Sequence, residues 1–552
     1  MRVLLLYPRP PATFWSFQGA LQLVGRKALL PPLGLITVAA LLPADWDLRL
    51  VDEQVQDPTA DDWHWAQLVI LSAMLVQRQS LKRLIAAAKA HALPVAVGGP
   101  FATSTPEAPE LHQADFLILD EGELTIPQFL AALERDETRG CFRSNDQRAD
   151  VSVSPVPRFD LLDQAAYNVM AVQFSRGCPF QCEFCDIIVL YGRKPRTKEP
   201  DQLLRELEAL HRLGWRGELF LVDDNFIGNR RNVQRLLAEL EPWQRRRGHP
   251  FRFTTEASLD LASDPELIET MVRSGFHRVF LGIETPDSAS LQQAGKHQNL
   301  RQPLVDAVQT IRGGGLQVMA GFILGFDGES PGAGRRIVSF VEATAIPLAM
   351  VGVLQALPNT ALWQRLADEG RMLESDGQGD AIDQGVQTYL LNYRPSRPMA
   401  QIAAEFLACF DALYEPTTYL ERVYRSCLQQ GSLRDSAIPS ATGLGPLPPG
   451  LLRGLLILVW RQGIRRSSRW RFWRRLVDLA RSRPRALPDF LWLLLAEEHM
   501  LLYRQEMHHQ VETQLASPVL RGASKPLQAP TSAVATPKQE VADRQPALGA
   551  AE

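Results

Sequence analysis

Three cysteines lie close together in the chain, at Cys178, Cys182 and Cys185. Their spacing is Cys-x3-Cys-x2-Cys, and the apolar run 169–174 just before them predicts a strand. Three thiolates on one loop can bind three irons of a cubane cluster and leave the fourth iron without a protein ligand. A reacting metal site needs an open coordination position of this kind. The spacing therefore favours a reactive iron–sulfur site.

Three other interpretations of these cysteines remain open at this point. A structural zinc site needs a fourth ligand nearby, and the nearest downstream histidine, His211, lies outside zinc-finger spacing. The cysteines could also form a disulfide with one spare thiol, or be buried structural residues.

The same run resembles the signature of the radical S-adenosylmethionine (SAM) enzymes. The resemblance implies that Cys178, Cys182 and Cys185 hold a 4Fe-4S cluster whose free iron chelates the amino and carboxylate groups of SAM. It also implies that Phe184, the aromatic residue before the last cysteine, packs near the adenine.

The composition is that of an ordinary globular protein. The chain has 552 residues, 45% of them hydrophobic and 22% charged, and a net charge of −3. This length allows three or four domains, and the charge balance gives no reason to expect a nucleic-acid partner.

The apolar run at residues 3–8 is too short for the apolar region of a signal peptide and predicts a first strand. The uncharged run 28–44 contains three prolines and is shorter than the roughly 20 residues of a spanning helix. Clustered thiols suit a reducing compartment, so we expect a cytoplasmic protein.

Residues 1–135 alternate short apolar runs with helical stretches. This alternation predicts an α/β domain built on a doubly wound parallel sheet. Ligands bind such sheets beyond the carboxyl ends of the strands, where Ser72 and the pair Gly98-Gly99 fall. Glycines there allow a large ligand to approach the backbone, although a Gly-Pro turn without a chemical role explains them equally well. Expected strands are 3–6, 48–51, 68–71, 95–97 and 116–119.

This region resembles the cobalamin-binding domain found upstream of many radical SAM cores. The resemblance rests on residues 31–35, 97–100 and 121–123, and it implies that Ser72, Gly98 and Gly99 contact cobalamin. The motif Asp-x-His-x-x-Gly of such domains is missing, because residues 7–30 contain no histidine. No histidine from that motif can therefore be the lower axial ligand, and a domain that has lost its cofactor stays open as a hypothesis.

Residues 136–167 are polar and proline-containing and predict a linker. Residues 168–390 contain six strand–helix units, which predict a partial (β/α)6 barrel with its chemistry at the carboxyl ends of the strands. Carboxylates at four such ends could bind an ammonium group or a ribose; helix caps and solvated loop acids are the alternative. Resemblance places Asp223 and Asp224 at the methionine amino group of SAM, Glu256 and Glu284 near the ribose, and Gly321 and Gly325 at the adenine.

Residues 391–516 lose the alternation and predict a helical domain. Within it, the segment 453–485 carries eleven arginines and one acid among apolar and aromatic residues. Such a segment suits an anionic membrane surface or an acidic partner, or a basic face packed on its own protein. The domain resembles a C-terminal extension of certain radical SAM enzymes, some of which act on lipids such as hopanoids. Residues 517–552 predict a disordered tail.

These features and resemblances together predict a radical SAM enzyme that methylates an unactivated carbon through a 5′-deoxyadenosyl radical, with cobalamin as methyl donor. A radical rearrangement or oxidation with a vestigial cobalamin domain is the second hypothesis, and a non-enzymatic iron–sulfur electron carrier the third. The expected partners are a small-molecule or lipid-like substrate, an electron donor such as flavodoxin or ferredoxin, and a membrane surface contacted through 453–485.

Overall fold

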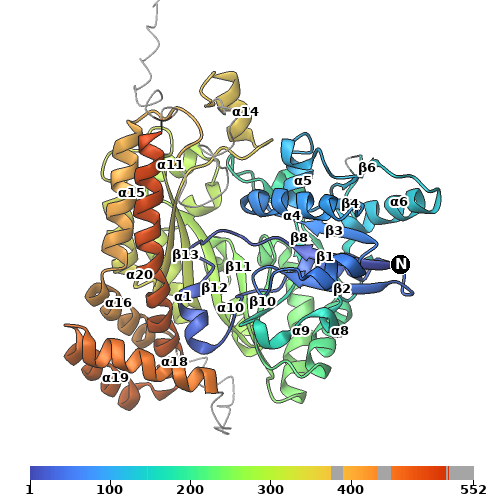
Figure 1. Ribbon diagram of the computed structural model, residues 1–552. Helices are drawn as coiled ribbons and strands as arrows, with labels where there is room; N and C mark the ends of the chain where they lie inside the picture. Colours follow the sequence, from blue (N-terminus) through green and yellow to red (C-terminus); the bar gives the residue numbers. More distant parts are fainter. Residues whose placement is uncertain (146, 374–389, 432–448, 518–519, 521–552) are drawn as a thin grey trace, which may run out of the picture.

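Two six-stranded parallel sheets form the centre of the structure, with a helical region on the far side of the second sheet (Figure 1). The computed structural model describes residues 1–145, 147–373, 390–431, 449–517 and 520. Nearly all of the expected disordered tail lies outside these residues.

The first sheet has the strand order β2-β1-β3-β4-β5-β6. Alternate residues of β1 belong to different apolar clusters, Leu4 and Leu6 to one and Val3 and Leu5 to the other, so both faces are covered. This confirms the doubly wound sheet, and the order reverses at β1, where such sheets bind ligands. The strands are β1 (Arg2–Tyr7), β2 (Asp47–Asp52), β3 (Leu68–Ser72), β4 (Val95–Gly98), β5 (Phe116–Ile118) and β6 (Gly140–Phe142). The main helices are α2 (Leu33–Ala39), α3 (Ala60–Trp65), α4 (Arg78–Ala90), α5 (Pro100–Ser104) and α6 (Gly122–Glu134).

Strand β6 differs from the sequence prediction, which began a linker at residue 136. Gly140–Phe142 pairs with β5 in parallel and closes the edge of the first sheet. Three residues beside a glycine are too short a run to show strand periodicity in a sequence.

The second sheet has its strands in consecutive order, β7-β10-β11-β12-β13-β14. Its edge strands β7 and β14 do not pair with each other, so the sheet is an open partial barrel, as predicted. The strands are β7 (Met170–Val172), β10 (Gly217–Leu221), β11 (Phe251–Ala257), β12 (Phe276–Glu284), β13 (Gln317–Leu324) and β14 (Leu348–Val353). The helices that follow them are α8 (Pro200–Arg212), α9 (Arg230–Arg246), α10 (Pro265–Arg273), α11 (Ser288–Gln293), α12 (Leu304–Gly313), α13 (Ala333–Thr344) and α14 (Ala361–Asp368).

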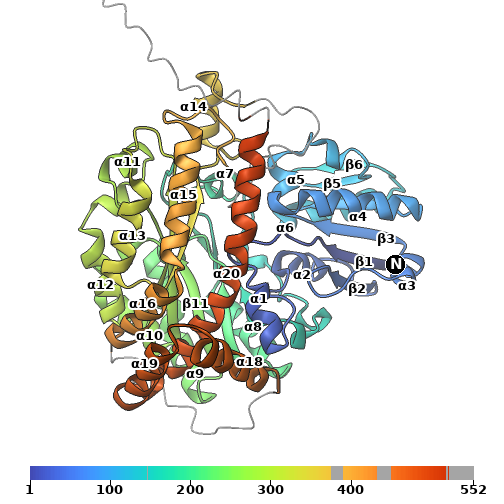
Figure 2. The same ribbon diagram turned by 60° about the vertical axis from the view of Figure 1, so that its left-hand side comes forward.

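The helical region is organised around α20 (Leu487–Ala516), which lies alongside α15 (Met399–Leu413) and α16 (Pro416–Gln429). Helices α18 (Pro449–Trp460) and α19 (Arg469–Ser482) lie near the start of α20 in both views (Figures 1 and 2). In the described part of the chain, no helix has the length and apolar character needed to cross a bilayer.

The loop after β1 joins all three regions. Trp15 lies 5.2 Å from Phe280 of the second sheet, measured between ring centroids, and its indole N–H donates to the Met350 sulfur. The neighbouring helix α1 (Gln18–Leu21) packs on α20, where the His499 ring nitrogen is 3.0 Å from the Thr13 carbonyl oxygen. The loop therefore packs against both the barrel and the helical region.

A buried ion-pair network joins the first sheet to the short hairpin of β8 (Ser175–Arg176) and β9 (Arg196–Thr197). Arg176 bonds Glu121 at 3.0 Å and Glu123 at 2.8 Å, and Arg196 bonds Glu121 at 2.8 Å. Burial alone would raise the pKa of Glu123, but the hydrogen bond and charge of Arg176 outweigh it and lower this pKa to about 2. Glu123 is therefore ionised and holds Arg176 at neutral pH.

Replacing Glu123 with glutamine should destabilise the protein by about 3 kcal/mol, because Arg176 keeps its buried charge and loses one partner. Since the pKa of Glu123 falls from 4.5 to about 2 on folding, its contribution is present above about pH 4.5 and is lost as the pH falls toward 2. Calorimetric unfolding should thus show a difference between Glu123→Gln and wild type at pH 7 that shrinks in acid. Glu134→Gln, at the exposed end of the same helix, is the matched control. If both substitutions lower the free energy of unfolding equally, the ion pair of Glu123 with Arg176 does not stabilise the fold as described.

Candidate active site between the two sheets

The three cysteines lie on the loop between β8 and the short helix α7 (Ile187–Leu190). Cys182 is buried, and Cys178 and Cys185 are half-buried. Gly177 begins the loop with φ 93°, and a Cβ there would lie 2.9 Å from the Gly192 carbonyl oxygen. Glycine is therefore required at this turn, which fixes where the cysteines project.

Two amide side chains donate hydrogen bonds to cysteine sulfur atoms. The Asn225 amide nitrogen lies 4.0 Å from Cys178 Sγ, and that of Gln298 lies 3.6 Å from Cys182 Sγ. Hydrogen bonds to the sulfurs are one of the factors that set the reduction potential of an iron–sulfur cluster. Asn225 follows Asp223 and Asp224 at the end of a predicted strand but was given no role from the sequence, and Gln298 has no local signal that would have revealed it.

The geometry separates the interpretations of the cysteine run. All six cysteines are free, which excludes a disulfide. Within the described ranges, no three Cys, His, Asp or Glu side chains converge closely enough to hold one metal ion. A mononuclear zinc site requires such convergence, whereas a four-iron cluster places its three thiolates on three different irons. Three free thiols on one loop are therefore available for three irons of a four-iron cluster.

The paired acids after β10 support the cysteine loop. Asp223 accepts hydrogen bonds from the Phe174 amide at 2.8 Å and the Ser175 hydroxyl at 2.6 Å. Asp224 accepts one from the Gly177 amide at 2.7 Å. Asp223 is thus committed to backbone support, whereas Asp224 also lines the cavity between the domains.

The strand-end carboxylates lie close enough to affect one another. Burial, followed by the negative charges of Asp224, Asp223 and Glu284, raises the pKa of Glu256 to about 8. Burial is also the main cause that raises the pKa of Asp223 to about 7 and of Asp224 to about 6. A group of carboxylates that repel one another favours a cationic ligand.

Glu284 ends β12 in a left-handed conformation, with φ 67°. A non-glycine residue in this region is strained by roughly 1–3 kcal/mol. Its carboxylate pairs with the buried ammonium group of Lys296, which lies 5.9 Å from the Phe184 ring centroid. Lys296 is thus a buried cation beside the cysteine loop, and no motif in the sequence indicates it.

Gly321 within β13 and Gly325 just after it disfavour a side chain for two different reasons. A Cβ at Gly321 would lie 3.0 Å from the Phe280 ring, whereas Gly325 has φ 98° and donates its amide to Glu329 at 3.0 Å. The next residue, Phe326, packs edge-on against Phe184 with ring centroids 6.0 Å apart. The fold therefore brings Phe184 close to the end of β13.

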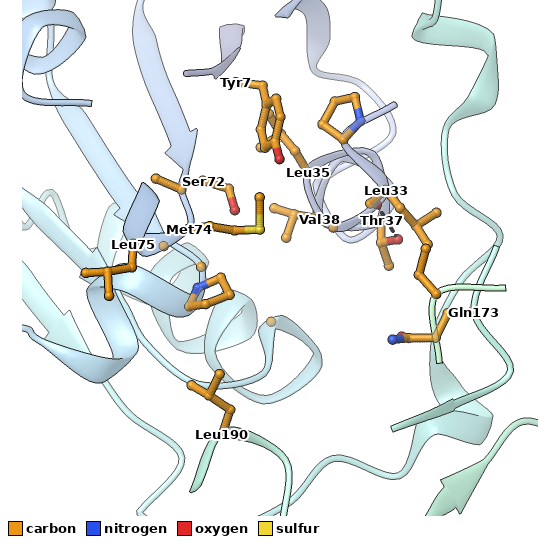
Figure 3. Close-up of a pocket in the computed structure, with 18 of the residues that line it drawn as sticks. Tyr7, Leu33, Leu35, Thr37, Val38, Ser72, Met74, Leu75, Gln173 and Leu190 are labelled. Atoms are coloured by element: carbon orange, nitrogen blue, oxygen red, sulfur yellow. Dashed lines mark hydrogen bonds between the residues drawn. The ribbon is translucent and has the colours of Figure 1, made fainter. Parts of the chain in front are cut away.

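A cavity of about 800 Å³ lies between the first sheet and the cysteine loop (Figure 3). In this view Ser72 and Met74 border it on the left, Gln173 lies on the right, and Leu190 lies at the lower edge. Gly98, Gly99 and Asp224 also line it, so the residues predicted for cobalamin and one residue predicted for SAM share one space. Most of the lining is apolar, which suits a large organic cofactor or substrate.

Gly98 and Gly99 pack too closely against neighbouring atoms to carry a side chain. A Cβ at Gly98 would lie 2.8 Å from the Ile118 carbonyl oxygen, and one at Gly99, whose φ is 91°, would lie 2.6 Å from Ser72 Oγ. No histidine of the described chain lines the cavity. If cobalamin occupies this space, its neighbours from the first sheet would be Ser72, Gly98 and Gly99 and not an imidazole.

Comparisons with protein families agree with this arrangement. Residues 23–130 match the B12 binding domain, 172–341 the radical SAM superfamily, and 360–513 a domain of unknown function, DUF4070. An uncharacterized methyltransferase of Synechocystis sp. is 53% identical, with 93% of this chain and 94% of that protein covered. The hopanoid C-2 methylase of Rhodopseudomonas palustris is 36% identical, with 92% and 94% covered.

Solved structures share the fold. The radical SAM methyltransferase TsrM of Kitasatospora setae, with cobalamin and a [4Fe-4S] cluster bound, has a TM-score of 0.56 at 15% identity and covers 70% of this chain and 81% of its own. The cobalamin-dependent radical SAM enzyme OxsB with aqua-cobalamin bound also reaches 0.56, at 14% identity, covering 93% and 84%.

Replacing Gly99 with alanine should reduce corrinoid binding, because the new methyl group meets Ser72 and the backbone is strained at φ 91°. The measurement is the corrinoid absorption of the protein after reconstitution with cobalamin and gel filtration. Gly313→Ala is the control, since a Cβ there meets nothing within 4 Å. Full corrinoid loading of Gly99→Ala would show that this turn does not border the cofactor.

Proposed function

The chain belongs to the radical SAM methyltransferases that carry a B12-binding domain, and from this membership we propose that it methylates an unactivated carbon of a hopanoid-like lipid. It is an enzyme that uses a 4Fe-4S cluster, SAM and cobalamin. The observation that carries the lipid proposal is the similarity to the hopanoid C-2 methylase along nearly the whole of both chains, the helical region included. The apolar lining of the cavity is consistent with a polycyclic hydrocarbon substrate.

The proposal gives each group of residues a task. When bound, the cluster and SAM supply a 5′-deoxyadenosyl radical, and cobalamin supplies the methyl group. Cys178, Cys182 and Cys185 would hold the cluster, with Asn225 and Gln298 donating to two of the sulfurs. Ser72, Gly98 and Gly99 would border cobalamin, and the apolar lining would exclude water from the reacting carbon.

The SAM contacts follow from charge. The carboxylates of Asp224, Glu256 and Glu284 would face the positive sulfonium and ammonium groups and the ribose. Lys296 would face the carboxylate of SAM, because it is the buried cation beside the cysteine loop. Phe184, with Gly321 and Gly325, would surround the adenine, as Phe184 and the end of β13 lie together.

Three finer points belong to the same proposal. An external reductant such as flavodoxin or ferredoxin would supply the electron, and a reducing cytoplasm would protect the clustered thiols. A lipid substrate favours peripheral membrane contact through residues 453–485. The domain limits would be 1–135, 168–390 and 391–516, with β6 added to the first domain.

The test is anaerobic turnover with a hopanoid and SAM labelled in its methyl group. Label in the lipid and formation of 5′-deoxyadenosine are expected from the reconstituted enzyme. Cys182→Ala should abolish both products, whereas Cys141→Ala, at an exposed thiol in β6, should retain them. If fully loaded enzyme forms 5′-deoxyadenosine in the presence of the hopanoid but leaves it unlabelled, the lipid proposal is wrong.

Glu256 provides a test of the SAM site by pH. With its pKa near 8, the carboxyl binds a proton at neutral pH, and a cationic ligand favours the ionised form. The affinity for SAM should therefore rise by up to about tenfold per pH unit from pH 6.5 to 8. In Glu256→Gln this rise should flatten, as measured by equilibrium dialysis, and exposed Glu269→Gln should behave as wild type.

The stability of the ligand-free protein should move in the opposite direction. The pKa of Glu256 is raised from 4.5 to about 8, so the folded state keeps a proton that the unfolded state loses across this window. Stability consequently falls as the pH rises from about 4.5 to 8, and Glu256→Gln should remove part of that fall. If the free energy of unfolding changes with pH in the same way in Glu256→Gln and in wild type, Glu256 does not titrate in this range. The pH dependence predicted for SAM binding would then lose its basis as well.

A further inference from the structure

Helices α18 and α19, with the π-helical turn Arg461–Arg465 between them, form one end of the helical region (Figure 2). The eleven arginines of 453–485 divide into two groups. Four serve the protein's own fold: Arg461 and Arg466 pair with Glu498 and Glu497, Arg475 pairs with Glu421, and Arg483 donates to the Leu428 and Gln430 carbonyls.

The remaining seven arginines are exposed, and none forms an ion pair with an acid in the described ranges. They are Arg453, Arg465, Arg469, Arg471, Arg474, Arg481 and Arg485. The single acid of the segment, Asp478, accepts a hydrogen bond from the Tyr424 hydroxyl. A basic face packed on its own protein thus accounts for four arginines and leaves seven to solvent.

Apolar side chains run along the same two helices. Residues at four-residue spacing share one face of a helix, and four such residues on α18 and the turn are exposed: Leu452 48%, Leu456 63%, Trp460 57% and Ile464 52%. On α19, Trp470 is 73% exposed, Trp473 37% and Val477 43%. Single exposed apolar residues are ordinary, but rows of large ones with two or more tryptophans indicate an interaction surface.

A shallow depression of about 610 Å³ lies on α19. Three arginines and one acid line it together with aromatic and aliphatic side chains: Arg474, Arg475, Arg481, Asp478, Tyr424, Trp470, Trp473 and Val477. A guanidinium group binds phosphate oxygens in a bidentate manner, and tryptophan favours positions between apolar and aqueous surroundings. The arginines of the depression could therefore bind a lipid phosphate, and its tryptophans could lie in the interfacial layer of the bilayer beside that phosphate.

We propose that the surface of α18 and α19 docks the protein on an anionic lipid bilayer, with the apolar rows among the acyl chains and the exposed arginines at the phosphates. Charge complementarity selects this occupant, because a second copy of the chain would bring its own seven arginines against these. An acidic protein would satisfy the arginines but not the aliphatic row on α18. The surface is independent of the identity of the substrate.

The test is flotation of the reconstituted enzyme with vesicles of phosphatidylcholine alone or of equal parts phosphatidylcholine and phosphatidylglycerol. The wild type should float with the anionic vesicles. A triple variant Trp460→Glu, Ile464→Glu, Trp470→Glu should bind at least about tenfold more weakly, and Arg465→Gln, Arg471→Gln, Arg474→Gln roughly 100-fold more weakly. Matched controls at exposed sites elsewhere, Val153→Glu with Leu213→Glu and Arg205→Gln with Arg212→Gln, should float like the wild type.

Cleavage of SAM by the variants reports on their folding and should stay at the wild-type level. Loss of flotation in the arginine variant with unchanged flotation of the apolar variant would show that the apolar rows do not enter the bilayer, which would overturn the proposed docking geometry. Unchanged flotation in both variants, or a lowered unfolding temperature without a change in flotation, would also overturn it. Flotation that depends on these residues while no hopanoid is methylated would support docking and count against the substrate.

Discussion

The buried ion pairs of Arg176 and Arg196 with Glu121 and Glu123 set the relation between the two sheets. Arg176 lies two residues before Cys178, and Glu121 and Glu123 begin helix α6 at the edge of the cavity. Buried charges are stable only when they are paired with good geometry, so this network specifies one placement of the cysteine loop against the first sheet. A reaction that uses two cofactors facing one substrate requires such a fixed placement.

The two sides of the cysteine loop differ in charge. On the barrel side, Asp223, Asp224 and Glu256 have raised pKa values because they are buried near one another, and Lys296 compensates Glu284 alone. On the side of the first sheet the lining is mainly apolar. Asp224 belongs to both regions, because it is one of these acids and also lines the apolar cavity. The acids therefore lie next to a space that suits a large apolar molecule.

Much of this could be predicted from the sequence, because its signals are local. The spacing of Cys178 to Cys185 and the acids at strand ends are visible within a few residues, and the alternation of strands and helices predicted both sheets. Lys296 and Gln298 could not be found in this way, since they approach the cysteine loop from more than 100 residues away. The arginines of 453–485 show the limit most clearly: composition revealed the basic segment, but only the fold separates the four that pair internally from the seven that face solvent.

Aromatic residues stand in the loop where the histidine of the cobalamin motif is missing. Phe14, Trp15 and Phe17 pack among Phe280, Tyr414 and His499. This packing joins the first sheet to the barrel and to α20, and Thr13, Trp15 and Ser16 of the same loop also line the cavity. The side chains that border the cavity near β1 and β3, Tyr7 and Met74, offer a phenol and a thioether, which are weak ligands compared with imidazole. Cobalamin would therefore be held by the shape of the cavity, and the loop after β1 contributes to that shape because Thr13, Trp15 and Ser16 form part of its wall.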